Sequence, residues 1–134
     1  LTVLGTSADG ADCGQVGRGN RVNGIIPLNR PTCSEAAAGK NPVSHVGKIY
    51  NVLAHHIAKK LYDNIDGCRE VYVMLLSRIG APINEPQTAT AQVLLERGLK
   101  VADVTRKAED VIGKELASIN RFCGELSRGK YPIC

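Results

Sequence analysis

One apolar stretch, EVYVMLL at residues 70–76, decides the fold of this chain. Apolar side chains fall on both alternating faces of the stretch, which is typical of an inner strand that is covered on each side. A short buried helix would give a similar pattern, but the length and the β-branched content favour a strand. Residues 88–95 alternate well enough for a second strand. A turn-rich connection with two prolines, at residues 79–86, separates the two, so we expect the strands to be antiparallel.

Two helices are expected around this pair of strands. Asn41 and Pro42 suit the N-cap and the first position of a helix, and the turn formers at residues 63–67 predict its end. Asp103 is a candidate N-cap for the second helix. Apolar residues recur at helical spacing in both segments: Val43, Val46, Tyr50, Leu53, Ile57 and Leu61 in the first, and Val104, Ala108, Val111, Ile112, Leu116 and Ile119 in the second.

The order of these elements predicts an α+β fold, a two-layer sandwich with the helices on one face of a small antiparallel or mixed sheet. Residues 1–4 are typical of a strand already in progress, and no initiator methionine precedes them. We therefore expect residues 1–134 to be one domain of a longer chain. Exposed apolar surface is expected where the rest of that chain and a partner would pack.

Composition narrows the classes of function. Hydrophobic residues make up 43% and charged residues 22%, as in soluble globular proteins. The net charge of +4 suits anionic ligands such as nucleotide phosphates. With no Trp and one Phe, few rings are available to stack on bases, so nucleic acid is not an expected partner.

The cysteines and the apolar runs bear on the cellular compartment. Five cysteines at irregular spacing, without a CxxC pair, indicate neither a disulfide framework nor a zinc site. No apolar run approaches the roughly 20 residues of a membrane span, and no signal peptide is visible. We expect a cytoplasmic protein without a membrane partner.

Residues 12–24 form the densest candidate site, in which four glycines alternate with Arg18, Arg21 and Asp12. Glycines allow a backbone to approach a ligand closely, and an arginine can bind two phosphate oxygens at once. The spacing matches neither the Walker phosphate loop nor the dinucleotide fingerprint. A surface loop with solvated arginines is the alternative.

A second candidate lies at Lys40, just before the predicted helix, where backbone N–H groups and the helix dipole favour anions. A lysine in a flexible connection is the alternative. His45 follows within one helical turn. It could act at the site, cap the helix or pack against its neighbours, and the sequence leaves these roles open. His55 and His56 are adjacent and point about 100° apart, so they do not form a metal pair; we assign them no function.

Two long strings, GRGNRVNG at residues 17–24 and EAAAGKNPVSHVGKIYN at residues 35–51, resemble the archaeal class of methionine adenosyltransferases, or S-adenosylmethionine synthetases. Residues 72–86 and 88–93 also resemble it. The resemblance implies the C-terminal domain of a three-domain chain that works as a homodimer with active sites between subunits. It implies the formation of S-adenosylmethionine from ATP and L-methionine, with release of pyrophosphate and phosphate, and the cations Mg²⁺ and K⁺.

The resemblance also implies roles for individual residues. Arg18, Arg21 and Lys40 are the expected catalytic residues at the phosphates, Asp12 is expected to contact methionine or the nucleoside, and Ile79 to form an apolar wall on the substrate side. Gly19 stands where the bacterial pattern has a second basic residue, and the candidates for that charge are Arg21, Lys48 and His45. Cys13 stands where the family pattern has a further acid, and a thiol does not replace a carboxylate as a ligand for hard metals. Without the N-terminal part, we expect little or no catalysis; the alternative function is a stand-alone nucleotide- or polyanion-binding module.

Overall fold

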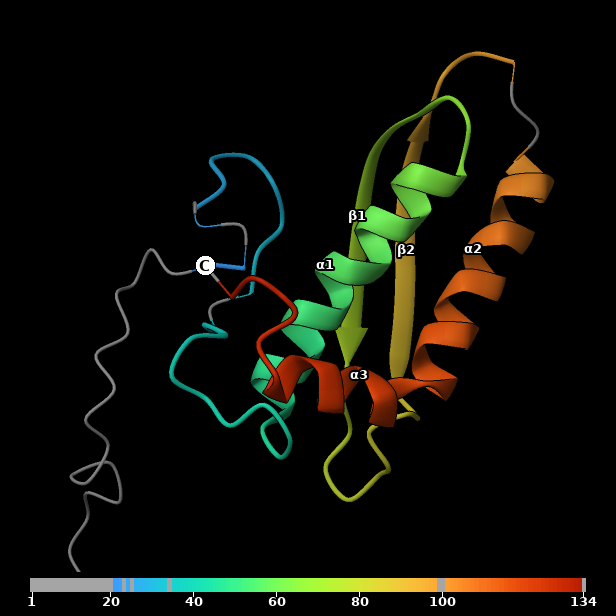
Figure 1. The fold of residues 1–134 in the computed structure, drawn as a ribbon. Coiled ribbons are helices and arrows are strands. Elements are labelled where there is room, and N and C mark those ends of the chain that lie inside the picture. The colour runs from blue at the N-terminus through green and yellow to red at the C-terminus, as the bar shows by residue number, and fades with distance from the viewer. Residues whose placement is uncertain (1–20, 23, 25, 34, 99–100, 134) are drawn as a thin grey trace, which may run out of the picture.

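The structure is a computed structural model that describes residues 21–22, 24, 26–33, 35–98 and 101–133. Its elements run in the order α1 (Val46–Asn64), β1 (Cys68–Leu76), β2 (Thr88–Leu95), α2 (Val101–Ala117) and α3 (Ile119–Ser127) (Figure 1). The strand predicted at residues 1–4, and the candidate site residues Asp12 and Arg18, lie outside the described residues.

Strands β1 and β2 form an antiparallel pair, as predicted, with Val73 opposite Ala91. A register shift lies between Cys68 and Glu70, at the start of β1. In β2, exposed and half-buried residues alternate without a break, because successive side chains of a strand point to opposite faces. The predicted bounds of this second strand are confirmed.

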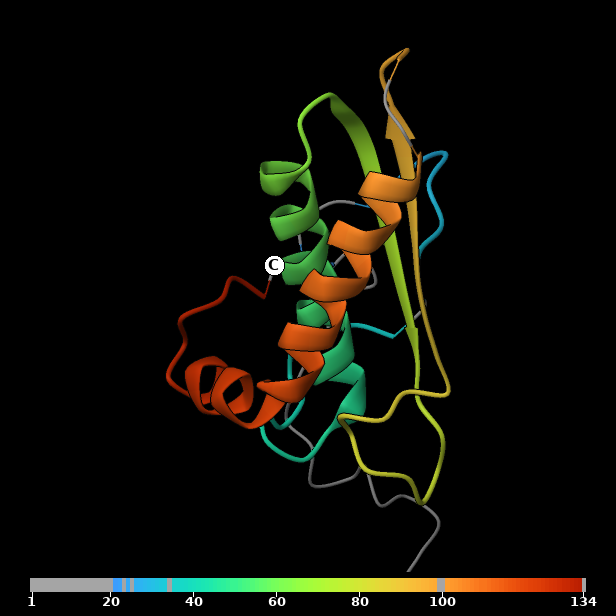
Figure 2. The ribbon, with the colours of Figure 1, turned by 90° about the vertical axis from the view of Figure 1, so that its right-hand side faces the viewer.

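Helices α1 and α2 cover one face of the strand pair, and α3 turns away across the end of α2 (Figure 2). The core lies between α1 and the sheet. Four residues of α1 at helical spacing have no exposed surface, and β1 turns three half-buried residues toward them: Ile49, Leu53, Ile57 and Leu61 from the helix, and Val71, Val73 and Leu75 from the strand. The predicted α+β architecture is confirmed.

The expectation that β1 is covered on both faces is wrong for the described part of the chain. Met74 and Leu76 point away from the helices and remain 52% and 55% exposed. Leu94 of β2, which is 40% exposed, lies on the same outer face. The second face of β1 is thus apolar but uncovered, which is the kind of exposed apolar surface that the sequence leads us to expect.

The first helix begins at Val46 and not at Asn41 and Pro42, as predicted. Asn41 acts one turn earlier, where its Oδ1 accepts hydrogen bonds from the backbone N–H groups of Val43 at 2.8 Å and Ser44 at 3.0 Å. Asparagine has the same chemistry in an isolated turn as at an N-cap. The sequence signal was therefore real, but it marks a turn that precedes the helix.

The second predicted helix divides into two. Its apolar stripe is confirmed, but α2 ends at Ala117 and α3 starts at Ile119. The hydroxyl group of Ser118 donates a hydrogen bond to the carbonyl oxygen of Lys114 at 2.9 Å, a local bond that competes with the helical pattern and favours bending. Asp103 lies in the first turn of α2 and is not its N-cap. Helix α3 was not predicted.

A search of the described residues finds no helix that combines the length and the apolar character needed to cross a membrane.

Candidate functional site

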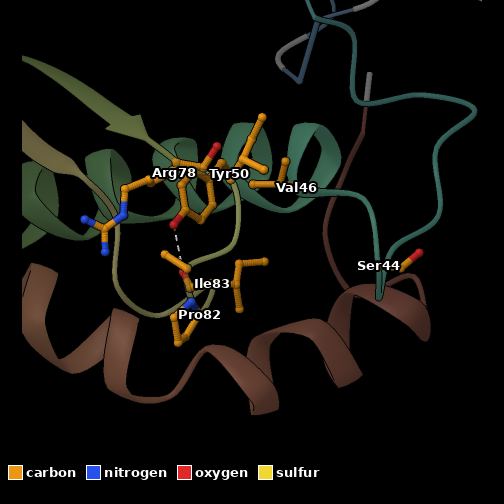
Figure 3. Close-up of a pocket in the computed structure, with 9 residues that line it drawn as sticks. Ser44, Val46, Tyr50, Arg78, Pro82 and Ile83 are labelled. Carbon is orange, nitrogen blue, oxygen red and sulfur yellow. Dashed lines mark hydrogen bonds between the residues drawn. The ribbon is translucent and has the colours of Figure 1, made fainter.

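The first turn of α1 and the loop after β1 lie at the same end of the molecule (Figure 1). One hydrogen bond joins them, because the hydroxyl group of Tyr50 on α1 donates to the backbone oxygen of Ile83 at 2.7 Å (Figure 3). Tyr50 is buried, and burial raises the pKa of its hydroxyl group. It therefore stays protonated at neutral pH and holds the loop against the helix.

A small cavity of about 260 Å³ opens beside this hydrogen bond (Figure 3). Ser44 and Val46 line it from the start of α1, and Arg78 and Ile79 line it from the loop. The side chain of Ile79 is fully exposed, although large apolar side chains are usually sheltered. Ile79 thus offers an apolar surface next to the residues that flank His45.

Lys40 lies beside this helix end and forms an ion pair with Glu35, with 3.0 Å between Nζ and Oε1. The two partners differ in exposure, since the side chain of Lys40 is 19% exposed and that of Glu35 is 47% exposed. Glu35 is therefore the more exposed partner, and Lys40 is the more buried one.

Lys48, in the first turn of α1, is buried, with only 7% of its surface exposed. Burial lowers the pKa of its ammonium group, and the positive charge of Lys40 lowers that pKa further. Within the part of the chain that the structure describes, no carboxylate forms an ion pair with Lys48. Two ammonium groups thus lie near one another, and one carboxylate is paired with one of them, an arrangement that an added anion would stabilise.

His45 is the N-cap of α1. Its Nδ1 accepts a hydrogen bond from the backbone N–H of Gly47 at 3.0 Å. A ring nitrogen that accepts a hydrogen bond carries no proton, so a charge on Nδ1 would break the cap. Of the roles left open for His45, capping is the one that the structure shows.

Arg21 is half-buried and lines a larger groove of about 900 Å³ that runs along α1 and the edge of β1. Arg30 and Glu35 line the same groove. Lys40 and Lys48 are not among its lining residues. The structure thus brings Lys40, Lys48 and His45 together at the helix end, with Ile79 across the small cavity, and leaves Arg21 in the groove.

The cations that the resemblance implies were tested against these side chains. No group of three or more His, Cys, Asp and Glu side chains that could hold a metal ion is present among the described residues. Glu35, an acid beside the helix end, is already paired with Lys40. The described residues do not fit a site for Mg²⁺ or K⁺, and we derive no step through either ion.

A polar network outside this end was missed by the sequence analysis. Glu115 of α2 is buried, and its carboxylate lies 2.5 Å from Lys60 and 3.3 Å from His56, both on α1. The ring of His56 also packs against Phe122 and Tyr131. The signal was available, because Glu115 falls on the apolar stripe of its helix, between Ile112 and Ile119 at spacings of three and four.

Comparison with known proteins identifies the family. The model of S-adenosylmethionine synthetase (AdoMet synthetase) matches residues 1–130 of the chain. The chain belongs to this family. The lysines at the start of α1 lie within the matched residues.

Archaeal S-adenosylmethionine synthases are among the similar proteins. The protein of Methanobrevibacter smithii is 48% identical over 130 residues, which cover 97% of this chain and 32% of that protein. The protein of Archaeoglobus fulgidus is 46% identical over 130 residues, 97% of this chain and 33% of its own length. That of Haloarcula marismortui is 48% identical over 129 residues, 96% of this chain and 32% of its own length. The chain spans about a third of the length of these relatives.

Proposed function

We propose that this chain takes part in forming S-adenosylmethionine from ATP and L-methionine, with release of pyrophosphate and phosphate. It does so as the C-terminal domain of a longer methionine adenosyltransferase that acts as a homodimer. The family match over residues 1–130 is the observation that carries the proposal. The free cysteines Cys33, Cys68 and Cys123 are compatible with a reducing cytoplasm, where we place the activity.

The reaction requires positive charges that are held in fixed positions. When the methionine sulfur attacks C5′ of ATP, the whole triphosphate leaves as a polyanion, and positive groups held in place before the reaction stabilise that developing charge. Lys40 and Lys48 are two such groups. The side chain of Lys40 is 19% exposed, and Lys48 as a whole residue is 7% exposed. Arg18 and Arg21 of the glycine-rich segment are proposed to bind the same phosphates.

The substrate side is assigned by the same argument. Ile79 lines the cavity beside the start of α1 and offers an apolar wall against which the nucleoside or the methionine side chain packs. Asp12 is proposed to contact methionine or the nucleoside. Holding both substrates in line accounts for much of the catalysis of such a displacement, because it removes the entropic cost of bringing them together.

A nucleotide- or polyanion-binding module without catalysis is the second candidate. One observation favours it: the lysine pair, its carboxylate and the helix end are all formed by residues 35–48. Anion binding at this end therefore needs no residue from outside the chain, whereas the displacement reaction does.

Assays of S-adenosylmethionine formation separate the two functions. The complete reading frame that encodes this chain is assayed with ATP and methionine beside the 134-residue chain itself, together with Lys40→Met and Lys48→Met in the longer protein. We expect the longer protein to turn over and both variants to lose at least about tenfold in rate, since a hydrogen bond to a charged group contributes about 1.5–3 kcal/mol. Lys107→Met, which removes an exposed positive charge from α2, is the matched control. A longer protein that binds ATP and forms no product would support the binding module instead.

A further inference from the structure

The charge arrangement at the start of α1 contains a carboxylate that the proposed function does not use. Glu35 forms the 3.0 Å ion pair with Lys40 and is the more exposed partner. It also lines the large groove, whereas Lys40 does not. Glu35 is therefore the member of the pair that a ligand in the groove would contact.

The stem of Glu35 lies close against the first turn of the helix. A Cβ atom on Gly47 would lie only 2.9 Å from Cγ of Glu35, nearer than such atoms approach one another in proteins. The absence of a side chain at Gly47 is thus what allows the stem of Glu35 to lie on the first turn of α1. The backbone N–H of Glu35 is held as well, by a hydrogen bond to Sγ of Cys33 at 3.3 Å.

The lysine pair gains from a counter-ion whether or not a ligand is present. Lys48 is buried without an ion-pair partner among the described residues, and Lys40 is close enough to depress its pKa. One exposed carboxylate offsets part of this charge. A chain of phosphates carries several negative charges and would offset more of it, so the two compete for the same ammonium group.

We propose that Glu35 is a built-in counter-ion of the anion-binding end, which pairs with Lys40 in the empty chain and is displaced when the phosphate groups of the ligand bind. This inference rests on the proposed phosphate-binding role of Lys40 and adds its regulation. Glu35 acts through Lys40 and is a positioning residue. It keeps the ammonium group in place until the ligand arrives, and its removal strengthens anion binding.

The test is a calorimetric titration, with inorganic tripolyphosphate, of the protein encoded by the complete reading frame. We expect Glu35→Gln to bind about two- to fivefold more tightly than the unaltered chain, the range measured for breaking an exposed ion pair. Glu109→Gln, which removes the same charge from an exposed position on α2, is expected to bind as the unaltered chain does. In a Lys40→Met background, most of the gain from Glu35→Gln is expected to disappear, because its partner is gone. A merely structural role for Glu35 would not produce this dependence on Lys40.

The outcomes separate this inference from the function on which it rests. Unchanged or weaker binding by Glu35→Gln, with binding still lost in Lys40→Met, overturns the counter-ion and leaves the phosphate site standing. A gain that persists in full in the Lys40→Met background also overturns it. No binding by the unaltered chain, or binding that ignores Lys40, contradicts the proposed phosphate site itself. Glu35→Ala and a thermal unfolding curve for each variant guard against a folding defect, since Glu35→Ala is expected to tighten binding as Glu35→Gln does.

Discussion

The carboxylate of Glu115 on α2 lies 2.5 Å from the ammonium group of Lys60 on α1. The side chain of Glu115 is 9% exposed and that of Lys60 is 38% exposed. His56 is a second partner, 3.3 Å from the same carboxylate. This group therefore links α1 and α2 through a buried carboxylate.

Glu115→Gln is expected to lower the free energy of unfolding by about 1–3 kcal/mol, because it leaves the positive charge of Lys60 without its counter-ion next to a buried amide. The partial exposure of Lys60 keeps the loss below that of a fully buried pair. Urea unfolding of the complete chain measures it. Glu109→Gln, at an exposed position of the same helix, should change the free energy by less than about 0.5 kcal/mol. Equal effects of the two substitutions would show that the network contributes nothing.

Acid should destabilise the chain through His56. Burial lowers the pKa of its imidazole below 6.5 and the charge of Lys60 lowers it further, while Glu115 and Glu125 raise it in part. The folded state thus favours the neutral ring. The resulting stability is present above pH 6.5 and is lost as the pH falls through the lowered pKa. We expect the free energy of unfolding to fall between about pH 7 and pH 5, and less steeply in His56→Gln.

His55 contributes to the same pH range, because partial desolvation lowers its pKa too, although the residue lies at the exposed surface of α1. His55→Gln is therefore the matched variant for the pH series. It should remove only its own part of the slope, and the double variant should be flatter than either. If the slope of the unaltered chain were retained in the double variant, the histidines would not be the groups responsible.

Gly47→Ala should fail to stabilise α1, although alanine is favoured over glycine in a helix by up to about 1 kcal/mol. The new Cβ would lie 2.9 Å from Cε1 of His45 and 2.9 Å from Cγ of Glu35, so both side chains must move. The move costs the N-cap hydrogen bond, a loss of about 1 kcal/mol. We expect an unchanged or lower melting temperature, measured by circular dichroism. A clear rise would mean that the cap contributes little.

Ile79→Ala should separate binding from folding. The side chain is fully exposed, so the free energy of unfolding should change by less than about 0.5 kcal/mol. If Ile79 packs against a substrate, its loss should weaken the binding of ATP or methionine to the longer protein by up to about tenfold, the effect of losing an apolar contact of this size. Unchanged affinities for both substrates would remove Ile79 from the site.

Much of the fold was predictable because its signals are local. The approximate alternation at residues 88–95 and the apolar stripe of α1 were sufficient to predict their elements. The start of α1 was misplaced because Asn41 caps a turn with the same hydrogen bonds that would cap a helix. The break at Ser118 was missed because a single serine within an apolar stripe gives no periodic signal.

The candidate site was predictable as a set of charges but not as an arrangement. Lys40 and Lys48 stand out in the sequence, yet their proximity depends on the turns between residues 35 and 45, which bring Glu35 onto the face of α1. His45 was ambiguous because a histidine at a helix start can either cap the helix, as its Nδ1 does here, or bind a ligand. The buried network around Glu115 depends on a contact between two residues, Lys60 and Glu115, that are 55 positions apart in sequence, which local patterns do not report.

The central claim is that the start of α1 binds the phosphate chain of a nucleotide. Its most direct test is the affinity of the protein encoded by the complete reading frame for inorganic tripolyphosphate. We predict binding that Lys40→Met and Lys48→Met each weaken by about tenfold or more, as expected for losing a hydrogen bond to a charged group, and that Lys107→Met leaves unchanged. Equal affinities for the unaltered chain and the Lys40→Met, Lys48→Met double variant would contradict the account.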